Sequence, residues 1–328
     1  MSTAQPLSAP APAPAPGTAR SSSPGARLLR GPYWVTVRQH RRAFWIVLLA
    51  VVLSLGVVAG LRIAEAPEGD TSHAYGGLRV VMDYASTAML LLPLLVGAFV
   101  AGPMIARELE SGTFRLAWTQ SVTPARWLAA KLTVATVTTV LATLALIGVY
   151  RLGWSRVAGT YQFHWADRGV YEATGPVVVA YCLLGIAAGA LVGQLVRRAV
   201  PAMAATGLVT GLVLLVLGSL RWDLVPASTL TTQVRPEPGL IPADSLLTAS
   251  GVIATDGQRV PGWSCWQQDG DRMSPLVCPD QKEVSGLFAE FHPTSHFWAI
   301  QGIETGIVLA LAALALFAAF RVLRARHP

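Results

Sequence analysis

The sequence predicts an all-α integral membrane protein with six transmembrane helices. Of its 328 residues, 53% are hydrophobic and 13% are charged, whereas about a quarter of the residues in a soluble domain are charged. Six apolar runs are long enough for a helix to cross a hydrocarbon core about 30 Å thick. They comprise residues 43–61, 84–106, 132–150, 175–196, 199–220 and 297–320. The runs are apolar on every face, while membrane-barrel strands would alternate apolar and polar residues, so we expect helices.

The positions of the basic residues predict how the helices are oriented. The chain carries 25 Lys and Arg against 18 Asp and Glu. If both termini lie inside, most of the basic residues fall in cytoplasmic segments, where Glu108 and Glu110 are the acids that oppose them. This asymmetry is typical of cytoplasmic loops. We therefore expect a multi-pass protein of the cell membrane with cytoplasmic termini, and the lipid bilayer rather than nucleic acid as its surroundings.

The segments before the first run have their own composition. Residues 1–26 are rich in Ala, Pro and Ser, so they cannot bury enough apolar surface to fold, and we expect a disordered cytoplasmic tail. Residues 27–42 mix aromatic residues with a basic cluster, which fits either a helix lying in the interface or an ordinary positive flank. The candidate residues of such a helix are Trp34, Arg38, Gln39, His40 and Arg41.

The longest polar segment, residues 221–296, is predicted to lie outside the cell. Pro and Gly punctuate it, so we expect a small, irregular cap before the last helix at 297–320, which a short cytoplasmic tail, 321–328, follows. Cys265 and Cys278 lie in this segment. An oxidising exterior would allow a disulfide between them, although the sequence offers no geometry that tests the pairing.

Few polar side chains lie within the apolar runs. Glu304 is the one acid there, a turn away from Gln301. An ionisable group in lipid is costly and often functional, but a position about two turns from the outer border also fits a residue that is simply paired or protonated. His292 and His296 have the spacing of metal ligands on a helix, yet no third ligand is evident, so we predict no metal site.

Sequence motifs of catalysis are not found. A P-loop requires a lysine followed by Ser or Thr, and Lys131 and Lys282 lack that neighbour. The sequence also contains no HExxH or GxSxG motif. We therefore predict that the chain is not an enzyme, holds no cofactor and does not hydrolyse ATP by itself.

The loop at residues 107–131, between the second and third runs, is the most informative stretch. Its acids, glycine and hydroxyl residues suit short helices broken by a turn, and Pro124 suits the start of the next element. We call residues 107–131 the elbow. Such a charged segment projecting from the membrane suits the docking of a partner.

At this point the sequence resembles the type-2 ABC transporter permeases. An E-x-G-T pattern follows the second span in that family, and residues 110–113 read E-S-G-T. The onward run LAWTQSVTPARWLAAKL, the segment WVTVRQHRR before the first span and FHPTSHFWAIQGIET before the last are similar to the family as well. His296 departs from the arginine expected at its position, which leaves the role of that residue open.

The resemblance implies a type-2 ABC exporter permease-like bundle, a second permease copy or homologue, and a separate ATP-binding ABC ATPase subunit. It also implies that residues 27–42 form a connecting helix and that the elbow couples to the ATPase. The implied coupling residues are Arg107, Glu108, Glu110, Gly112, Thr113, Arg115, Trp118, Thr119 and Arg126. The implied activity is export of a small hydrophobic or amphipathic compound; an ion-coupled secondary transporter, a membrane enzyme and a non-transporting signalling partner are the alternatives.

Overall fold

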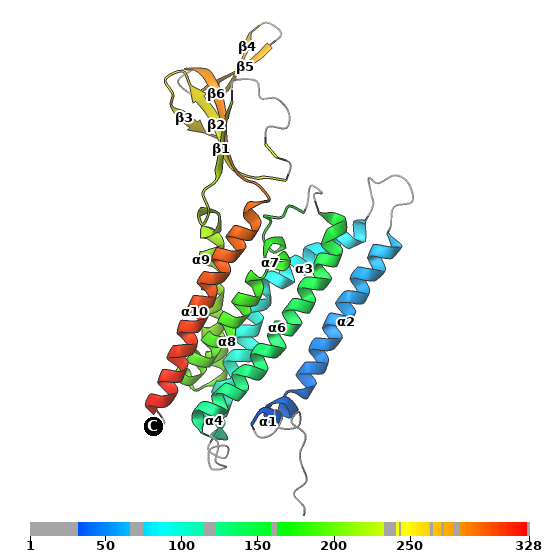
Figure 1. Cartoon of the computed structure of the whole chain (residues 1–328), viewed down its shortest axis with the longest axis vertical. Helices are drawn as coiled ribbons and strands as arrows, with labels where there is room; N and C mark the ends of the chain where they lie inside the picture. The colour runs from blue at the N-terminus through cyan, green and yellow to red at the C-terminus, as the bar shows by residue number, and fades with distance from the viewer. Residues whose placement is uncertain are drawn as a thin grey trace, which may run out of the picture.

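The structure, a computed structural model, contains six membrane-length helices, shorter helical segments and a β-sheet in the part of the chain that it describes (Figure 1). It describes residues 32–65, 75–114, 123–158, 163–232, 241–242, 244–262, 265–269, 272–277 and 282–326. Six helices in this part are long and apolar enough to cross a membrane, namely Arg41–Ala64, Gly76–Ser111, Pro124–Val157, Val177–Val196, Ala199–Asp223 and His296–Arg326. The predicted number of membrane helices is therefore confirmed.

The two ends of the helix bundle differ. Helix α1 and the last turns of α4 and α10 lie at one end, and the sheet projects from the opposite end (Figure 1). We call these the elbow end and the sheet end.

A short helix precedes the first span. Helix α1, Pro32–Gln39, ends at a turn at His40, and α2, Arg41–Ala64, follows at once. The structure thus contains a helix within the predicted connecting segment, while residues 27–31 lie outside the described residues.

The second span changes its helical winding half-way. Helix α3, Gly76–Leu95, leads into a π-helical segment η3, Val96–Ala101, and then into α4, Gly102–Ser111. Pro93 and Pro103 lie on either side of the π-helical segment. A proline cannot donate a backbone hydrogen bond and crowds the preceding turn, so a change of winding between these two prolines is expected.

Helix α8, Val177–Val196, is the central helix, because 78% of its membrane-length window is buried. Its glycines allow close contact with the second span: a Cβ on Gly189 would lie 2.5 Å from the Ala101 Cβ and 2.7 Å from the Ala101 carbonyl carbon. Gly185 and Gly193 approach the same span one turn away on either side. The small residues at four-residue spacing therefore pack helices within one chain.

The remaining helices complete the bundle. They are α6, Pro124–Val157; α7, Val170–Thr174; α9, Ala199–Leu220, with the 3-10 turn η4, Arg221–Asp223; and α10, His296–Arg326. Helix α6 extends the predicted run at both ends, and α7 is a short helix at the sheet end.

The segment between α9 and α10 folds as an antiparallel sheet rather than as the irregular cap we expected. Its strands are β1, Ser228–Thr232; β2, Leu246–Ala254; β3, Arg259–Pro261; β4, Cys265–Asp269; β5, Arg272–Val277; and β6, Lys282–His292. The order is β3-β2-β6-β5-β4, with β1 also paired to β6. In β2, buried Val252 and Ala254 alternate with more exposed neighbours, as one buried sheet face requires. Gly257 and Gly262, with φ of +82° and +83°, flank β3 in turns, so these glycines punctuate strands.

Candidate coupling elbow and buried charge cluster

Two helix caps lie within the elbow, one at the end of α4 and one at the start of α6. Helix α4 ends at Ser111, and Gly112 follows with φ of +71°, the left-handed conformation that commonly ends a helix. Helix α6 begins after Thr123, whose side-chain oxygen accepts the Arg126 backbone N–H at 3.3 Å. The predicted coupling residues Arg115, Trp118 and Thr119 lie outside the described residues.

Glu108 fastens α4 to α6. Its Oε1 lies 2.6 Å from Lys131 Nζ, and its Oε2 accepts a hydrogen bond of 3.0 Å from Trp127 Nε1. The side chains of Lys131 and Glu108 are 5% and 20% exposed, so solvent screens this ion pair less than a surface pair. The first two turns of α6 are thus held to α4.

Glu110 fastens α4 to a third span. Its Oε2 accepts the backbone N–H of Ala199, the first residue of α9, at 2.9 Å. Arg198, which precedes that helix, provides no side-chain cap. A carboxylate at a helix N-terminus satisfies an otherwise unpaired N–H and interacts favourably with the helix dipole. Glu110 therefore acts as the cap of α9.

The other predicted coupling residues lie on the surface of the elbow. Arg107, Thr113 and Arg126 are exposed. The Ser111 and Thr113 hydroxyls are 2.9 Å apart. Among the described residues, neither Arg107 nor Arg126 takes part in an ion pair. These side chains are available to a partner, whereas Glu108 and Glu110 are engaged within the chain.

The connecting helix meets the elbow at His40. Trp34, Arg38, Gln39 and Arg41 are exposed. His40 is half-buried near Lys131, and burial together with the Lys131 charge lowers the pKa of His40 below its ordinary 6.5, while Glu108 opposes the shift. The structure thus brings two segments that are far apart in the sequence to one end of the bundle.

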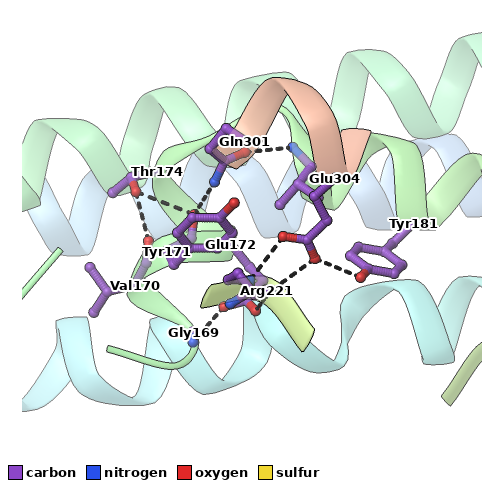
Figure 2. A network of polar contacts seen from close by, with 10 residues as sticks. Gly169, Val170, Tyr171, Glu172, Thr174, Tyr181, Arg221, Gln301 and Glu304 are labelled. Atoms are coloured by element: carbon purple, nitrogen blue, oxygen red, sulfur yellow. Dashed lines mark hydrogen bonds and ion pairs between the residues drawn. The ribbon is translucent and has the colours of Figure 1, made fainter. Parts of the chain in front are cut away.

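A cluster of buried charges lies at the sheet end of the bundle, where α9 ends, and Figure 2 shows its polar contacts from close by. Arg221 Nε donates to Glu304 Oε2 at 2.8 Å, and Arg221 Nη2 donates to Glu172 Oε1 at 2.6 Å. The Tyr181 hydroxyl donates to Glu304 Oε1 at 2.7 Å. These three charged side chains are at most 3% exposed, so the cluster holds two carboxylates and one guanidinium away from water.

Gln301 connects this cluster to the backbone where the chain enters α8. Its Nε2 donates to the Tyr171 carbonyl at 2.8 Å, and its Oε1 accepts the Val177 N–H at 3.1 Å. Glu172 Oε2 accepts the Gly169 N–H at 2.7 Å. Each of these bonds satisfies a backbone group that a helix end leaves unpaired.

Aromatic rings surround the guanidinium of Arg221. Its Cζ lies 3.9 Å from the centroid of the Tyr171 ring, a cation–π distance. Trp222 packs edge-to-face on Tyr171 and on Trp165, with ring centroids 5.8 Å apart in both pairs. Phe297 also contacts Tyr171, at 5.6 Å between centroids. The guanidinium of Arg221 thus lies against a group of packed aromatic rings.

The family comparison agrees with this bundle. Residues 43–221, more than half of the chain, match the family model described as ABC-2 membrane transporter related. The chain belongs to this ABC-2 family. It is thus an ABC-2 type permease, the membrane component of an ABC transporter, as the resemblance implied. No curated protein and no solved structure matches the chain. The match covers the elbow and ends at Arg221, so the sheet and α10 lie beyond it.

Sequence reasoning about this ABC-2 permease found two of the five polar residues named in the buried cluster. Gln301 and Glu304 were candidates, but Glu172, Arg221 and Tyr181 were not. Glu172 and Arg221 lie next to the ends of apolar runs, where charged residues are ordinary flanks of a span. The feature of the sequence that could have indicated the cluster is Glu304 itself, because a carboxylate within an apolar span requires a partner.

His292 and His296, whose spacing resembles that of metal ligands, lie close together in the structure. His292 Nδ1 and His296 Nδ1 are 3.1 Å apart and share a hydrogen bond. Among the described residues, no group of three or more His, Cys, Asp or Glu is placed to hold a metal ion. Cys265 begins β4, but Cys278 lies outside the described residues, so their disulfide stays a prediction.

Proposed function

We propose that this ABC-2 permease forms the transport path of an exporter for small hydrophobic or amphipathic compounds, driven by a separate ABC ATPase subunit that docks on the elbow. The observation that carries the proposal is that both ends of α9 are bound to other parts of the bundle. Glu110 caps its first residue, and Arg221, directly after its last residue, enters the buried charge cluster. One helix therefore connects the proposed docking surface to the opposite end of the bundle.

This connection supports a mechanism. Closure of the ATPases around ATP would move the elbow, and Glu108 and Glu110 would transmit the movement to α6 and α9. Packed helices move as rigid bodies, so a displacement at the start of α9 reaches Arg221 at its end. The cluster of Glu172, Arg221 and Glu304 would then hold the sheet end closed until the elbow moves.

In this proposal the elbow end faces the cytoplasm and the sheet lies outside. Basic residues support this orientation, because α1, the start of α2, the end of α4 and the first turn of α6 meet at the elbow end. These segments carry Arg38, Arg41, Arg107 and Arg126. A second permease copy or homologue would complete the assembly. Exposed apolar side chains along α2 and α9, such as Trp45 and Leu215, are available for contact with that copy or with lipid.

Co-purification tests the docking site. The tagged permease is purified in mild detergent together with the products of the adjacent genes. The Thr113→Trp, Arg126→Glu double variant alters exposed side chains on the elbow, and Arg324→Glu changes an exposed arginine of α10 as a control. We expect the ATPase with the wild type and the control and its loss from the double variant. Equal recovery in all three would refute docking on this surface.

Glu108→Gln tests transmission separately from docking. The variant keeps the surface of the elbow but removes the charge that pairs with Lys131. We expect the ATPase to co-purify as with the wild type, while transport per ATP hydrolysed in proteoliposomes falls. An unchanged ratio would show that the ion pair between Glu108 and Lys131 does not transmit the movement of the ATPase.

The buried cluster favours one second candidate, an ion-coupled transporter. Two carboxylates share one guanidinium, so the cluster has one acid in excess that a proton could neutralise. Proteoliposomes that contain the permease with and without the ATPase decide between the two. Uptake driven by an imposed proton gradient would support the ion-coupled candidate, and uptake that needs both the ATPase and ATP would support the exporter.

A further inference from the structure

A cavity lies between α2 and the rest of the bundle, toward the elbow end. Its volume is about 270 Å³, and its wall is almost entirely apolar, with Phe44 and Val47 from α2, Val96 from η3, and Val134 and Leu146 from α6. Toward the elbow it continues into a hollow of about 300 Å³. The two spaces share the lining residues His40, Ala43, Val100, Met104 and Lys131. Together they approach the size of typical small-molecule sites.

The cavity exists because α2 packs loosely. Only 6% of its membrane-length window is buried, against 78% for α8, and its one buried residue, Val58, lies toward the sheet end. Three of the lining residues, Ala43, Ala50 and Val100, are exposed, so the cavity opens sideways where a bilayer would surround the helices. An apolar space of this kind does not hold water, and hydrocarbon chains would enter it from the side.

The elbow end of the cavity is lined by apolar side chains together with a group of basic ones. The hollow is lined by His40, Arg107, Lys131 and Gln39, with Glu108 as the one acid among its lining residues. Among the described residues Arg107 forms no ion pair. Further exposed arginines adjoin the hollow in the sequence, namely Arg38, Arg41 and Arg42. The hollow thus forms a basic mouth of the apolar cavity. This combination is complementary to an amphiphile with an anionic head.

We propose that this cavity binds one acyl chain of an anionic membrane phospholipid, whose phosphate lies at the mouth beside Arg107 and Lys131. The sideways opening favours a membrane lipid over a soluble anion. The headgroup would contact the same Lys131 that Glu108 binds, so an occupied site adjoins the ion pair that holds α4 to α6. The proposal concerns lipid binding and does not rest on the exporter function.

Photo-crosslinking tests the position of the acyl chain. The full chain is reconstituted in vesicles of phosphatidylcholine that contain a trace of phosphatidylglycerol with a photoreactive group in its acyl tail. Ala142→Trp fills the cavity from α6, and Leu141→Trp places the same side chain on the outer surface of that helix, where Leu141 is 63% exposed. We expect crosslinks on peptides of α2 and α6 that line the cavity, their loss in Ala142→Trp and their retention in Leu141→Trp. Equal labelling of both variants would overturn the proposal.

A second pair of variants tests the headgroup, and it decides the matter if Ala142→Trp does not fold. Arg107→Gln removes a charge at the mouth, and Arg324→Gln removes one at the end of α10. We expect phosphatidylglycerol retention, measured by native mass spectrometry, to fall about fivefold in Arg107→Gln and to stay unchanged in Arg324→Gln. Equal retention of phosphatidylglycerol and phosphatidylcholine by the wild type would overturn the anionic-head assignment. Displacement of the lipid by soluble glycerol 3-phosphate alone would assign the mouth to a free anion instead.

Discussion

Arg221 and Glu304 form a bidentate ion pair, in which Arg221 Nε donates to Glu304 Oε2 at 2.8 Å and Nη2 donates to Oε1 at 3.1 Å. Arg221 directly follows α9, where the chain leaves the bundle for the sheet, and Glu304 lies in α10 shortly after the chain returns. This pair therefore joins the two stems of the sheet segment inside the bundle. The buried ion pair thus holds together the two helices, α9 and α10, between which the strands of the sheet lie in the sequence.

Removal of the arginine should destabilise the protein strongly. Arg221→Met leaves the Glu172 and Glu304 carboxylates buried without their counter-ion, which typically costs about 3–5 kcal/mol. We expect a clear fall in the unfolding temperature in detergent, and partial recovery when Glu172→Gln and Glu304→Gln are added. Arg324→Met, at an exposed arginine, is the control. A fall no larger than that of the control would contradict the assigned burial of the cluster.

The stability of the junction between β6 and α10 should depend on pH. Burial and the neighbouring His296 lower the pKa of His292 below 6.5, while the Trp222 backbone and Asp223 act in the opposite direction. Between the lowered pKa and 6.5 the unfolded chain binds more protons than the folded one, so stability is lost as the pH falls through this range.

Thermal unfolding at about pH 8 and about pH 5 measures this loss. We expect a smaller pH effect in His292→Gln, which removes the buried titrating group, and in His296→Gln, which removes the neighbouring charge. The same pH effect in the wild type and both variants would assign the dependence to other residues.

The close approach at Gly189 should not tolerate a methyl group. In Gly189→Ala the new Cβ would meet the backbone of Ala101 and Gly102 at under 3 Å, so α8 must move away from the second span. We expect a loss of about 1–3 kcal/mol in stability. Gly218→Ala, with no atom within 4 Å of its Cβ, should be neutral or slightly stabilising, since alanine is the better helix former. Equal stability of the two variants would argue against the close packing of α8.

Loss of the Glu110 carboxylate should release the start of α9. Glu110→Ala leaves the Ala199 N–H without its acceptor, which costs about 1 kcal/mol for a helix cap. Hydrogen exchange of the first amides of α9 should accelerate about fivefold, while Glu110→Gln keeps an acceptor and should change less. Ser219→Ala, at the far end of α9, serves as the control. Unchanged exchange in Glu110→Ala would show that Glu110 does not cap the helix.

The sequence by itself determined the six spans, because the length of an apolar run is a local property that the thickness of the bilayer tests directly. It also determined the family, through the E-S-G-T pattern at residues 110–113 and the runs around it. The strands between Arg221 and His296 could not be predicted in the same way, since frequent Pro and Gly residues masked short alternating segments whose pairing depends on β6, distant in the sequence.

The tertiary structure alone decided what the polar residues do. The spans are apolar all round, so their sequences do not show which face is buried, and Glu304 could have met water, lipid or a partner. Its partner Arg221 lies 83 residues away, and Glu110 caps a helix that begins 89 residues later. Such contacts arise from the packing of whole helices, and the free energy of burying a charge then selects arrangements in which the charge is paired.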